Sequence, residues 1–311
     1  MAKSIRDAYG EALVEFGKND TRVVVLDADV SSSTKSGLFY KTCPERFFNC
    51  GIAESNMAGI AAGFAATGKI PFVNTFAVFI TSNGLNAIRT FGSYSELPVK
   101  IAGAYGGISD SFDGSTHHSL EDIAIMRALP NFKVFCPCDE TQTRWLVKHA
   151  IDNPDPMYLR LARNEFPDVY KRGQSFEEGR AMIVREGKDA TVIACGLMVS
   201  NALKAAEILE RKNISIRVVD IFSIKPIDEN MIEKCARETG AVITAEEHNI
   251  YGGLGSAVAE VLAKKGIGTK FTMVGVNDRH VGSGPYDTLQ AYAGIDAYGV
   301  VNAVCKLVEC N

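Results

Sequence analysis

The sequence lacks an excess of positive charge, paired cysteine motifs and long apolar runs. Its 311 residues carry a formal net charge of −4, and this balance argues against a nucleic-acid surface. The eight cysteines show none of the Cys-x-x-Cys spacing of zinc sites and redox motifs, so we interpret them as reduced thiols, most of them in the core. Apolar stretches end well before the ~20 residues that a membrane span needs. We therefore expect no nucleic-acid partner and no membrane anchor.

The N-terminal segment MAKSIRDAYGEALVEF is amphipathic and carries both Glu and Asp. Secretory signals and transit peptides have a different composition, so we expect a cytoplasmic protein. Length points to more than one core, because single cores stop growing near ~250 to 300 residues. We expect two domains.

Short β-branched runs alternate with helical patterns along the chain, which is typical of βα units around a parallel sheet. The predicted fold class is therefore α/β, with one parallel-sheet domain over 1–165 and a smaller one over 190–311. Charged and turn-forming residues fill 166–189, which we interpret as a linker. The predicted strands of the first domain are 22–28, 69–75, 98–105, 132–137 and 157–162.

Glu54 stands at the head of the segment ESNMAGIAAGFAA, whose other residues are mostly Ala, Gly, Met, Ile and Phe. A carboxylate in the first turn of a helix complements the helix dipole by ~0.3 to 1 kcal/mol, which is one explanation for it. The segment has no polar face, however, and we expect a helix buried nearly all round, against another helix across an interface. Glu54 then enters an apolar environment and needs a partner, which suits a general acid or proton-sharing group.

A polar loop over 106–121 follows a predicted strand and precedes a helix. Ligands bind at the carboxyl ends of strands in parallel sheets, so we place Asp113, His117 and His118 on the pocket side. A metal site on the two histidines is disfavoured because adjacent side chains do not easily face one ion, and we predict no metal ligands. Ser119 and Asp122 also fit a capping role for the next helix.

Three further patterns have simpler explanations. Phe76 and Phe79 stand one helical turn apart, which usually indicates core packing. The cluster Tyr251-Gly-Gly-Leu-Gly-Ser256 lacks the third glycine of a dinucleotide fingerprint, so we interpret it as a tight turn. Cys136-Pro-Cys138 has no activating base nearby in sequence and is interpreted as structural.

Four motifs in order carry a resemblance to a known family: Gly51-Ile-Ala-Glu54, Asn74-Thr-Phe76-x-x-Phe79, Asp113-Gly-Ser-Thr-His117 and Arg160-Leu-Ala-Arg163. The chain resembles the C-terminal half of a transketolase over essentially its whole length. The resemblance implies two three-layer domains, a pyrimidine-binding domain of the thiamine diphosphate-binding fold and then a transketolase C-terminal domain. It also implies transfer of a two-carbon ketol unit from a ketose phosphate to an aldose phosphate, with thiamine diphosphate as cofactor.

The resemblance assigns cofactor contacts to four residues. Glu54 matches the glutamate that bonds a ring nitrogen of the aminopyrimidine, and a protonated carboxyl there helps the cofactor lose its reactive proton. Phe79 is expected to stack on the same ring, with Phe76 close by. Asp29 matches an aspartate near the cofactor.

Further matches concern the sugar. His117 is expected to bond the donor near the reacting carbon, and Asp113 a hydroxyl further along. Arg6, Ser33 and Arg163 match positions that hold the substrate phosphate, a task suited to guanidinium groups. Tyr105 stands where transketolases commonly have a histidine among these ligands, and a tyrosine brings no positive charge.

No Gly-Asp-Gly occurs in the chain, although full-length members hold the diphosphate and Mg²⁺ through that motif and a later Asn. We therefore expect a split enzyme whose N-terminal subunit supplies these contacts, in an α2β2 assembly. This chain alone would be catalytically incompetent.

Three other functions stay open. The beta subunit of 2-oxo acid dehydrogenases shares the two-domain layout, but the Asp113–His117 loop and Arg163 are closer to ketol transfer. Deoxyxylulose-phosphate synthase is nearer, but it is normally one long chain. An inactive regulatory or scaffolding subunit would have no need to keep all these residues together.

Overall fold

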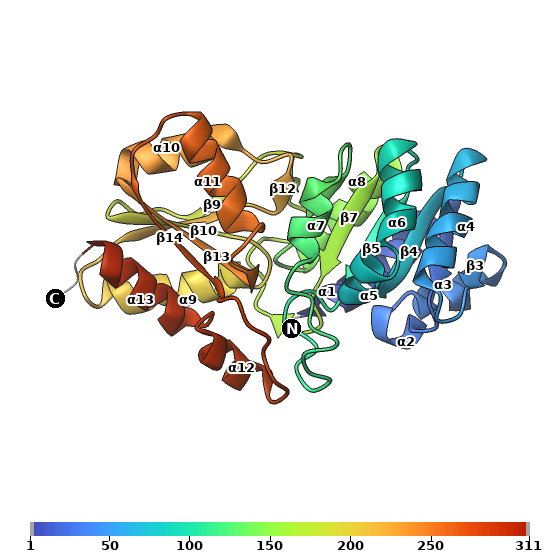
Figure 1. Ribbon diagram of the computed structural model, residues 1–311, viewed down its shortest axis with the longest axis horizontal. Coiled ribbons are helices and arrows are strands. Elements are labelled where there is room, and N and C mark those ends of the chain that lie inside the picture. Colours follow the sequence, from blue (N-terminus) through green and yellow to red (C-terminus); the bar gives the residue numbers. More distant parts are fainter. Residues whose placement is uncertain (1–2, 309–311) are drawn as a thin grey trace.

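The computed structural model describes residues 3–308, which form two three-layer α/β units (Figure 1). The first unit is built on a seven-stranded sheet of order β12-β6-β7-β5-β4-β2-β3. All its strands are parallel except the edge strand β12. The strands are β2 (Val23–Asp27), β3 (Phe47–Asn49), β4 (Ile70–Phe76), β5 (Lys100–Ala104), β6 (Lys133–Phe135), β7 (Met157–Leu161) and β12 (Ser223–Lys225).

The predicted strands of this sheet are confirmed to within two residues at each end, because their β-branched runs are buried on both faces, as in other parallel sheets. Alternate residues face opposite sides. Val23 and Val25 pack with α1 (Ile5–Gly17) and α8 (Glu140–Asp152), whereas Val24 and Leu26 pack with the helices on the other side. These are α4 (Glu54–Ala66), α5 (Ala77–Ser82), α6 (Leu85–Ala87), the π-helix Ile88–Tyr94 and α7 (Asp122–Ala128).

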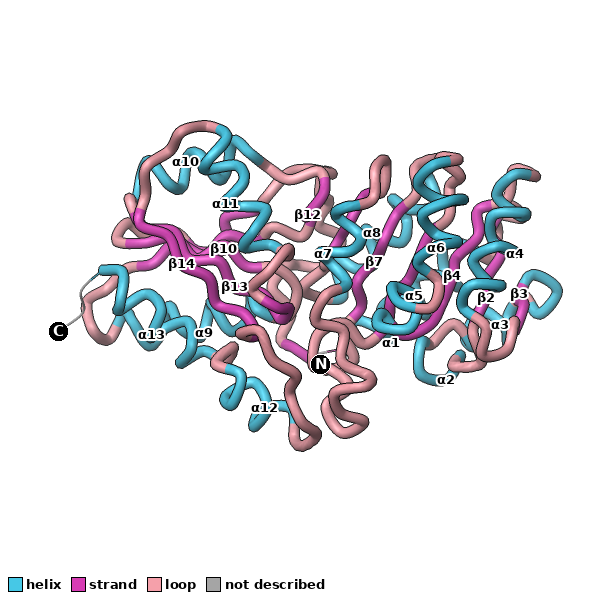
Figure 2. Tube along the Cα trace, in the orientation of Figure 1, coloured by secondary structure: helices cyan, strands magenta, loops and turns pink. Residues whose placement is uncertain are grey.

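The second sheet has the order β14-β13-β10-β11-β9. Its strands are drawn in magenta on the left of Figure 2. It contains β9 (Met182–Arg185), β10 (Ala190–Ala194), β11 (Ile216–Asp220), β13 (Ala241–Asn249) and β14 (Lys270–Val276), and β9 is the antiparallel edge. Helices α9 (Met198–Glu210) and α13 (Ala297–Val308) cover one face, and α10 (Glu229–Thr239) and α11 (Leu254–Lys264) cover the other (Figure 1). The remaining helices within residues 3–308 are α12 (Tyr286–Ala293), the short α2 (Ser31–Thr34) and α3 (Gly37–Thr42), and a 3-10 helix at Pro44–Arg46.

Segments cross between the two units. Strand β12 lies in the second half of the chain but pairs with β6 of the first sheet, and a small antiparallel pair joins β1 (Lys3–Ser4) to β8 (Glu165–Phe166). The segment predicted as a linker, 166–189, contains β9, which pairs with β11. One apolar cluster is continuous between the two units, so they pack as one body. Among residues 3–308, no helix combines the length and apolar character of a membrane span.

Candidate active site

The carboxyl ends of β2, β4, β5 and β7 bring most of the predicted site residues to one edge of the first sheet. This edge lies at the bottom of Figure 1, where α2, α5 and the loop after β5 gather. Adjacent parallel strands end side by side, so residues far apart in sequence meet there. Ser33 follows β2, Phe79 follows β4, His117 follows β5 and Arg163 follows β7.

Arg6, Ser33, Tyr105 and Arg163 lie together at this edge. The Nη1 atom of Arg6 donates to the carbonyl oxygen of Ser33 at 3.1 Å and to the hydroxyl of Tyr105. The guanidinium groups of Arg6 and Arg163 lie 5.2 and 5.4 Å from the centroid of the Tyr105 ring, within cation–π range. Tyr105 itself has φ of +63°, a left-handed conformation that is uncommon outside glycine. This conformation brings its ring within reach of both cations.

Asp110 joins this group, and sequence reasoning missed it. Arg163 Nη1 donates to Asp110 Oδ1 at 2.5 Å, and the aspartate is fully buried. Burial raises the pKa of the Asp110 carboxyl, and the neighbouring Asp113 raises it further, while Arg163 opposes both effects. The only sequence signal was its place in the polar loop three residues before Asp113.

Four rings pack around the same point. Phe76 and Phe79 are stacked with centroids 5.5 Å apart, and Phe76 lies 4.3 Å from Tyr105. The His117 ring stands edge-on to Phe79 at 5.2 Å, and its Nδ1 lies 3.1 Å from the hydroxyl of Thr116. The pair Phe76–Phe79 therefore belongs to the polar cluster and not to the main core.

Glu54 begins α4 and is buried, with 5% of its surface exposed. Asn83 Nδ2 donates to Glu54 Oε2 at 3.3 Å. Asn83 directly follows α5, the helix that carries Phe79. This hydrogen bond therefore joins the start of α4 to the end of α5. The helix α4 is not buried all round within the chain, because Asn56, Ile60 and Gly63 are exposed.

Asp29 is exposed, and it accepts a hydrogen bond from Asn49 Nδ2 at 2.8 Å. The buried aspartate nearby is Asp27, which accepts from the Val30 amide at 2.7 Å and from the hydroxyls of Thr34 and Ser36, and so holds the turn into α2. No group of three or more His, Cys, Asp or Glu residues within 3–308 is placed to hold a metal ion.

His118 lies in a different environment from His117. It is buried, and neither ring nitrogen has a hydrogen-bond partner among the described residues. Burial lowers its pKa. The two histidines therefore lie in different environments.

Residues of the second unit contact the loop over 106–121 and hold it in place. Glu247, at the end of β13, accepts from the Ile108 amide at 2.8 Å and from the hydroxyl of Tyr286. A Cβ at Gly107 would lie 2.3 Å from Glu247 Oε1, so only glycine fits there. Burial raises the pKa of Glu247 to about 7.

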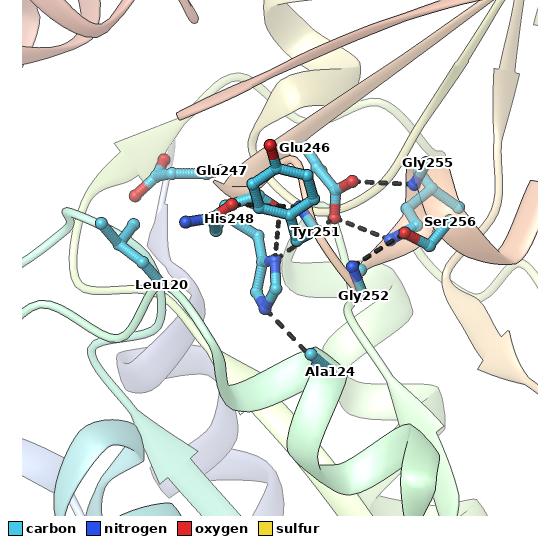
Figure 3. Close-up of polar contacts among 12 residues, drawn as sticks. Leu120, Ala124, Glu246, Glu247, His248, Tyr251, Gly252, Gly255 and Ser256 are labelled. Carbon is cyan, nitrogen blue, oxygen red and sulfur yellow. Dashed lines mark hydrogen bonds and ion pairs between the residues drawn. The ribbon is translucent and has the colours of Figure 1, made fainter. Parts of the chain in front are cut away.

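Glu246 and His248 flank Glu247 on β13, and Figure 3 shows them pointing to different neighbours. Glu246 accepts from the amides of Leu254 and Gly255, both at 2.7 Å, at the start of α11. His248 reaches the Ala124 amide of α7 at 3.4 Å. The carboxylate of Glu246 occupies the amides of the glycine cluster, which agrees with its interpretation as a turn and not as a phosphate cradle.

Arg160, Cys136 and Cys138 are buried in contacts that hold the fold together. Arg160 donates to buried Asp122 at 2.7 and 3.1 Å and to the backbone oxygen of Glu247 at 2.9 Å. Cys136 and Cys138 are both buried, and the Cys138 thiol donates to Asp220 at 3.6 Å.

Fold and site together define a two-domain α/β protein with a half-open polar and aromatic cluster where parallel strands end, the usual ligand position in this class. Comparison with known proteins identifies the family within this class. A model of "Transketolase, pyrimidine binding domain" matches residues 1–168, and one of "Transketolase, C-terminal domain" matches residues 179–300. The chain belongs to the transketolase family.

Relatives show which part of a transketolase it represents. It is 42% identical over 306 residues to a "Putative transketolase C-terminal section" of Methanocaldococcus jannaschii, covering 98% of this chain and 96% of that protein. It is 38% identical to rat transketolase, with 97% of this chain covered but 49% of the rat protein. A solved structure described as "Split gene transketolase, inactive beta4 tetramer" has 46% identity and a TM-score of 0.90, covering 100% of this chain and 99% of that chain. The prediction of a C-terminal transketolase half is confirmed.

Proposed function

We propose that this chain is the C-terminal subunit of a thiamine diphosphate-dependent transketolase, which moves a two-carbon ketol unit from a ketose to an aldose. The observation that carries the proposal is the corner between α4 and α5. There a buried carboxylate, Glu54, lies against the helix of a half-exposed aromatic ring, Phe79, and that ring adjoins His117.

This corner fits the aminopyrimidine of the cofactor. A flat heteroaromatic ring needs an aromatic face for stacking and one polar group in its plane. Phe79, backed by Phe76, offers the face, and Glu54 offers the polar group with one oxygen bonded only to the exposed Asn83. In this role Glu54 holds a proton and donates it to a ring nitrogen. The cofactor supplies the electron sink for breaking the carbon–carbon bond. Asp29, exposed beside Asn49, is assigned to the border of the same site.

Substrate groups follow along the same edge. His117 is the proposed catalytic group beside the reacting carbon, since its imidazole ring can donate or accept a hydrogen bond there. Asp113 is exposed in the same loop and can accept from a sugar hydroxyl. Arg6, Ser33 and Arg163 lie further along and bind the far end of the sugar.

The second half of the site is assigned to an N-terminal subunit, with the diphosphate and Mg²⁺ contacts, in an α2β2 assembly. The uncovered side of α4 supports a partner there. Ile60 and Gly63 are exposed, and nothing lies within 4 Å of the position of a Cβ at Gly63. Ile52 and Tyr94, next to α4 and in the adjoining π-helix, are 84% and 85% exposed. Such apolar exposure marks an interface. The related split-gene chain described as an inactive β4 tetramer agrees with a subunit that needs a different partner.

The test is reconstitution. Proteins that copurify with the chain from its native source are identified by mass spectrometry, and a stoichiometric partner carrying Gly-Asp-Gly and a later Asn is expected. The folded chain alone, with thiamine diphosphate and Mg²⁺, is expected to be inactive, and the pair active in ketol transfer. Equal turnover by the isolated chain would contradict the split site, and CO₂ release from pyruvate or branched 2-oxo acids would instead favour a dehydrogenase subunit.

A further inference from the structure

The loop over 106–121, which we name the donor loop, is supported along its length by the second unit. Two arginines of the first unit also bond it, Arg160 at the backbone oxygen of Ser119 and Arg163 at the carboxylate of Asp110. Four further residues of the loop form hydrogen bonds with the second unit: Ile108, Ser111, Ser115 and Leu120. The second unit thus holds the loop before, within and after its exposed tip.

The strand ends of the second sheet, the usual ligand position in a parallel α/β fold, hold the donor loop. This sheet changes direction at β10, since β11 lies on one side of it and β13 on the other, and ligands bind at such a point. Asn249 at the end of β13 donates to the backbone oxygen of Leu120 at 2.8 Å. After β14, the backbone oxygen of Val281 accepts from the Ser115 hydroxyl at 2.6 Å. The position where an independent domain would bind its ligand is therefore occupied by a loop of the first unit.

Glu247 is the central contact, because both of its carboxylate oxygens are bonded. Oε1 accepts from the Ile108 amide at 2.8 Å, and Oε2 accepts from the Tyr286 hydroxyl. Gln290 Nε2 donates to the same hydroxyl at 3.0 Å, so α12 holds the carboxylate in place. At Gly107 the loop passes too close to Glu247 Oε1 for a side chain. A carboxylate that accepts from a backbone amide forms a strong, charge-assisted hydrogen bond, so Glu247 fixes the start of the loop.

The cofactor corner of the proposed site is built differently. Glu54 is bonded by Asn83, and Phe79 stacks on Phe76, and all four residues belong to the first unit. A change in the second unit that displaces the donor loop should therefore leave the cofactor corner in place.

We propose that the second unit serves the reaction by positioning the donor loop, with Glu247 as the positioning residue that directs Asp113 and His117 toward the sugar donor. This inference rests on the proposed function, because that function assigns the two loop residues to the donor. Glu247 is buried and acts only through the loop. The competing explanation is that Glu247 merely stabilises the packing of the two units, and the two explanations differ in whether donor and cofactor are affected equally.

The experiment uses the reconstituted complex and compares Glu247→Ala with the wild type. For D-xylulose 5-phosphate, kcat/KM is expected to fall by about 10- to 100-fold, since small displacements of positioned groups have effects of this size. The loss is expected to be smaller with hydroxypyruvate, which has no hydroxyl group for Asp113 beyond the reacting carbon. The Kd of thiamine diphosphate, measured by calorimetry with Mg²⁺ present, is expected to stay within a factor of about two. Unchanged kcat/KM, or equal losses for both donors and the cofactor, would overturn the inference.

Glu246→Ala is the matched control. Glu246 is the preceding residue of β13 and is also buried, but its carboxylate accepts from two backbone amides of α11 and not from the donor loop. Its loss should lower stability and leave kcat/KM unchanged at a temperature where circular dichroism shows a folded chain. An equal loss of kcat/KM in Glu246→Ala would favour the packing explanation.

Two further variants grade the effect. Glu247→Gln keeps an oxygen for the Ile108 amide and is expected to recover most of the activity lost in Glu247→Ala. Tyr286→Phe removes one donor to the same carboxylate, and a several-fold loss of kcat/KM for D-xylulose 5-phosphate is expected. If Glu247→Ala does not fold, Tyr286→Phe takes its place, and unchanged kinetics in that variant would overturn the inference.

Hydrogen–deuterium exchange of the folded chain tests the positioning without turnover, since it reports local opening of backbone amides. In Glu247→Ala the amides of 106–121 are expected to exchange at least about tenfold faster than in the wild type, while those of 54–83 keep their rates. Unchanged exchange over 106–121 would reject the positioning of the loop. Absence of ketol transfer by the wild-type complex would instead reject the proposed function, so the two failures are distinguishable.

Discussion

Arg160 and Arg163 are three residues apart at the end of β7, and each pairs with a buried aspartate, yet the two pairs differ in every other respect. Asp122 accepts twice from Arg160 and once from the Tyr158 hydroxyl at 2.7 Å. Arg160 also bonds backbone oxygens of both domains. Asp110 has one bond from Arg163, whose side chain is 38% exposed.

The pKa values of Asp122 and Asp110 are shifted in opposite directions. Burial raises the pKa of Asp122, but Arg160 and Tyr158 more than compensate and leave it below the usual value. Burial and Asp113 leave the pKa of Asp110 above it. A fully satisfied pair therefore joins the domains, and an incompletely satisfied pair lies beside the residues proposed to bind the substrate. Unsatisfied polar groups are expected where a ligand will complete them.

The largest expected effect separates catalysis from stability at Glu54. Glu54→Ala in the reconstituted complex should lower kcat by about 10³-fold, because it removes the proposed proton donor to the cofactor. Its melting temperature should stay close to that of the wild type, since the one hydrogen bond lost is to exposed Asn83. Activity is measured with hydroxypyruvate, and near-normal turnover would remove the assigned role.

Asp122→Asn tests the satisfied pair. It leaves the Arg160 cation buried without a charged partner, and we expect a loss of about 3 kcal/mol in the free energy of unfolding. Urea denaturation of the chain measures this. The matched variant Glu260→Gln removes a carboxylate paired with Arg127 on the surface, where Glu260 is exposed, and should change stability by less than ~1 kcal/mol. Similar losses in both variants would contradict the distinction between the two classes of ion pair.

Glu247 links the two regions and predicts a pH dependence. Its folded pKa, about 7, lies above the ordinary value of 4.5 because of burial. The folded state therefore binds more protons than the unfolded state between about pH 4.5 and 7, and stability should fall as pH rises through that window, by up to ~3 kcal/mol. In Glu247→Gln this decrease should be absent, while the remainder of the profile is kept. Parallel profiles for wild type and variant, measured by urea denaturation across pH 5 to 8, would show that Glu247 does not titrate there.

Particular residues show how far sequence reasoning reached. The strands were predictable because β-branched runs encode parallel strands locally, whereas Glu54, Phe79 and His117 were proposed through ordered motifs. The apolar residues Ile80, Leu85 and Ile88 stand at helical spacing, but the structure divides them between α5, α6 and the π-helix. A Cβ at Gly84 would lie 2.9 Å from the carbonyl oxygen of Ile80, so the chain turns too tightly there for a larger residue.

Asp110 and Glu247 could not be found in the same way. The importance of Asp110 depends on Arg163, 53 positions later in the chain, which meets it only because β5 and β7 are neighbours in the sheet. Glu247 contacts Ile108 from the other domain, 139 positions away. Neither contact has a local pattern. Pairings of this kind are set by sheet order and domain packing, which periodicity does not report.

The smallest expected effect is the change in the free energy of unfolding caused by Asp110→Asn. Its sign is opposite to that expected for Asp122→Asn, so it gives the sharpest contrast between the two aspartates. Asp110→Asn preserves an oxygen for Arg163 and replaces the unpaired Oδ2 with an amide that can donate to Asp113. The neighbouring carboxylates then no longer repel one another, and the raised pKa of Asp110 shows that its ionised form is disfavoured in the folded chain. Near pH 7 we therefore expect Asp110→Asn to be neutral or more stable by about 0.5 to 1 kcal/mol. Urea denaturation beside Asp122→Asn is the measurement. Loss of several kcal/mol in Asp110→Asn would mean that Arg163 needs this carboxylate as much as Arg160 needs Asp122, and the pair would then belong to the framework and not to the substrate site.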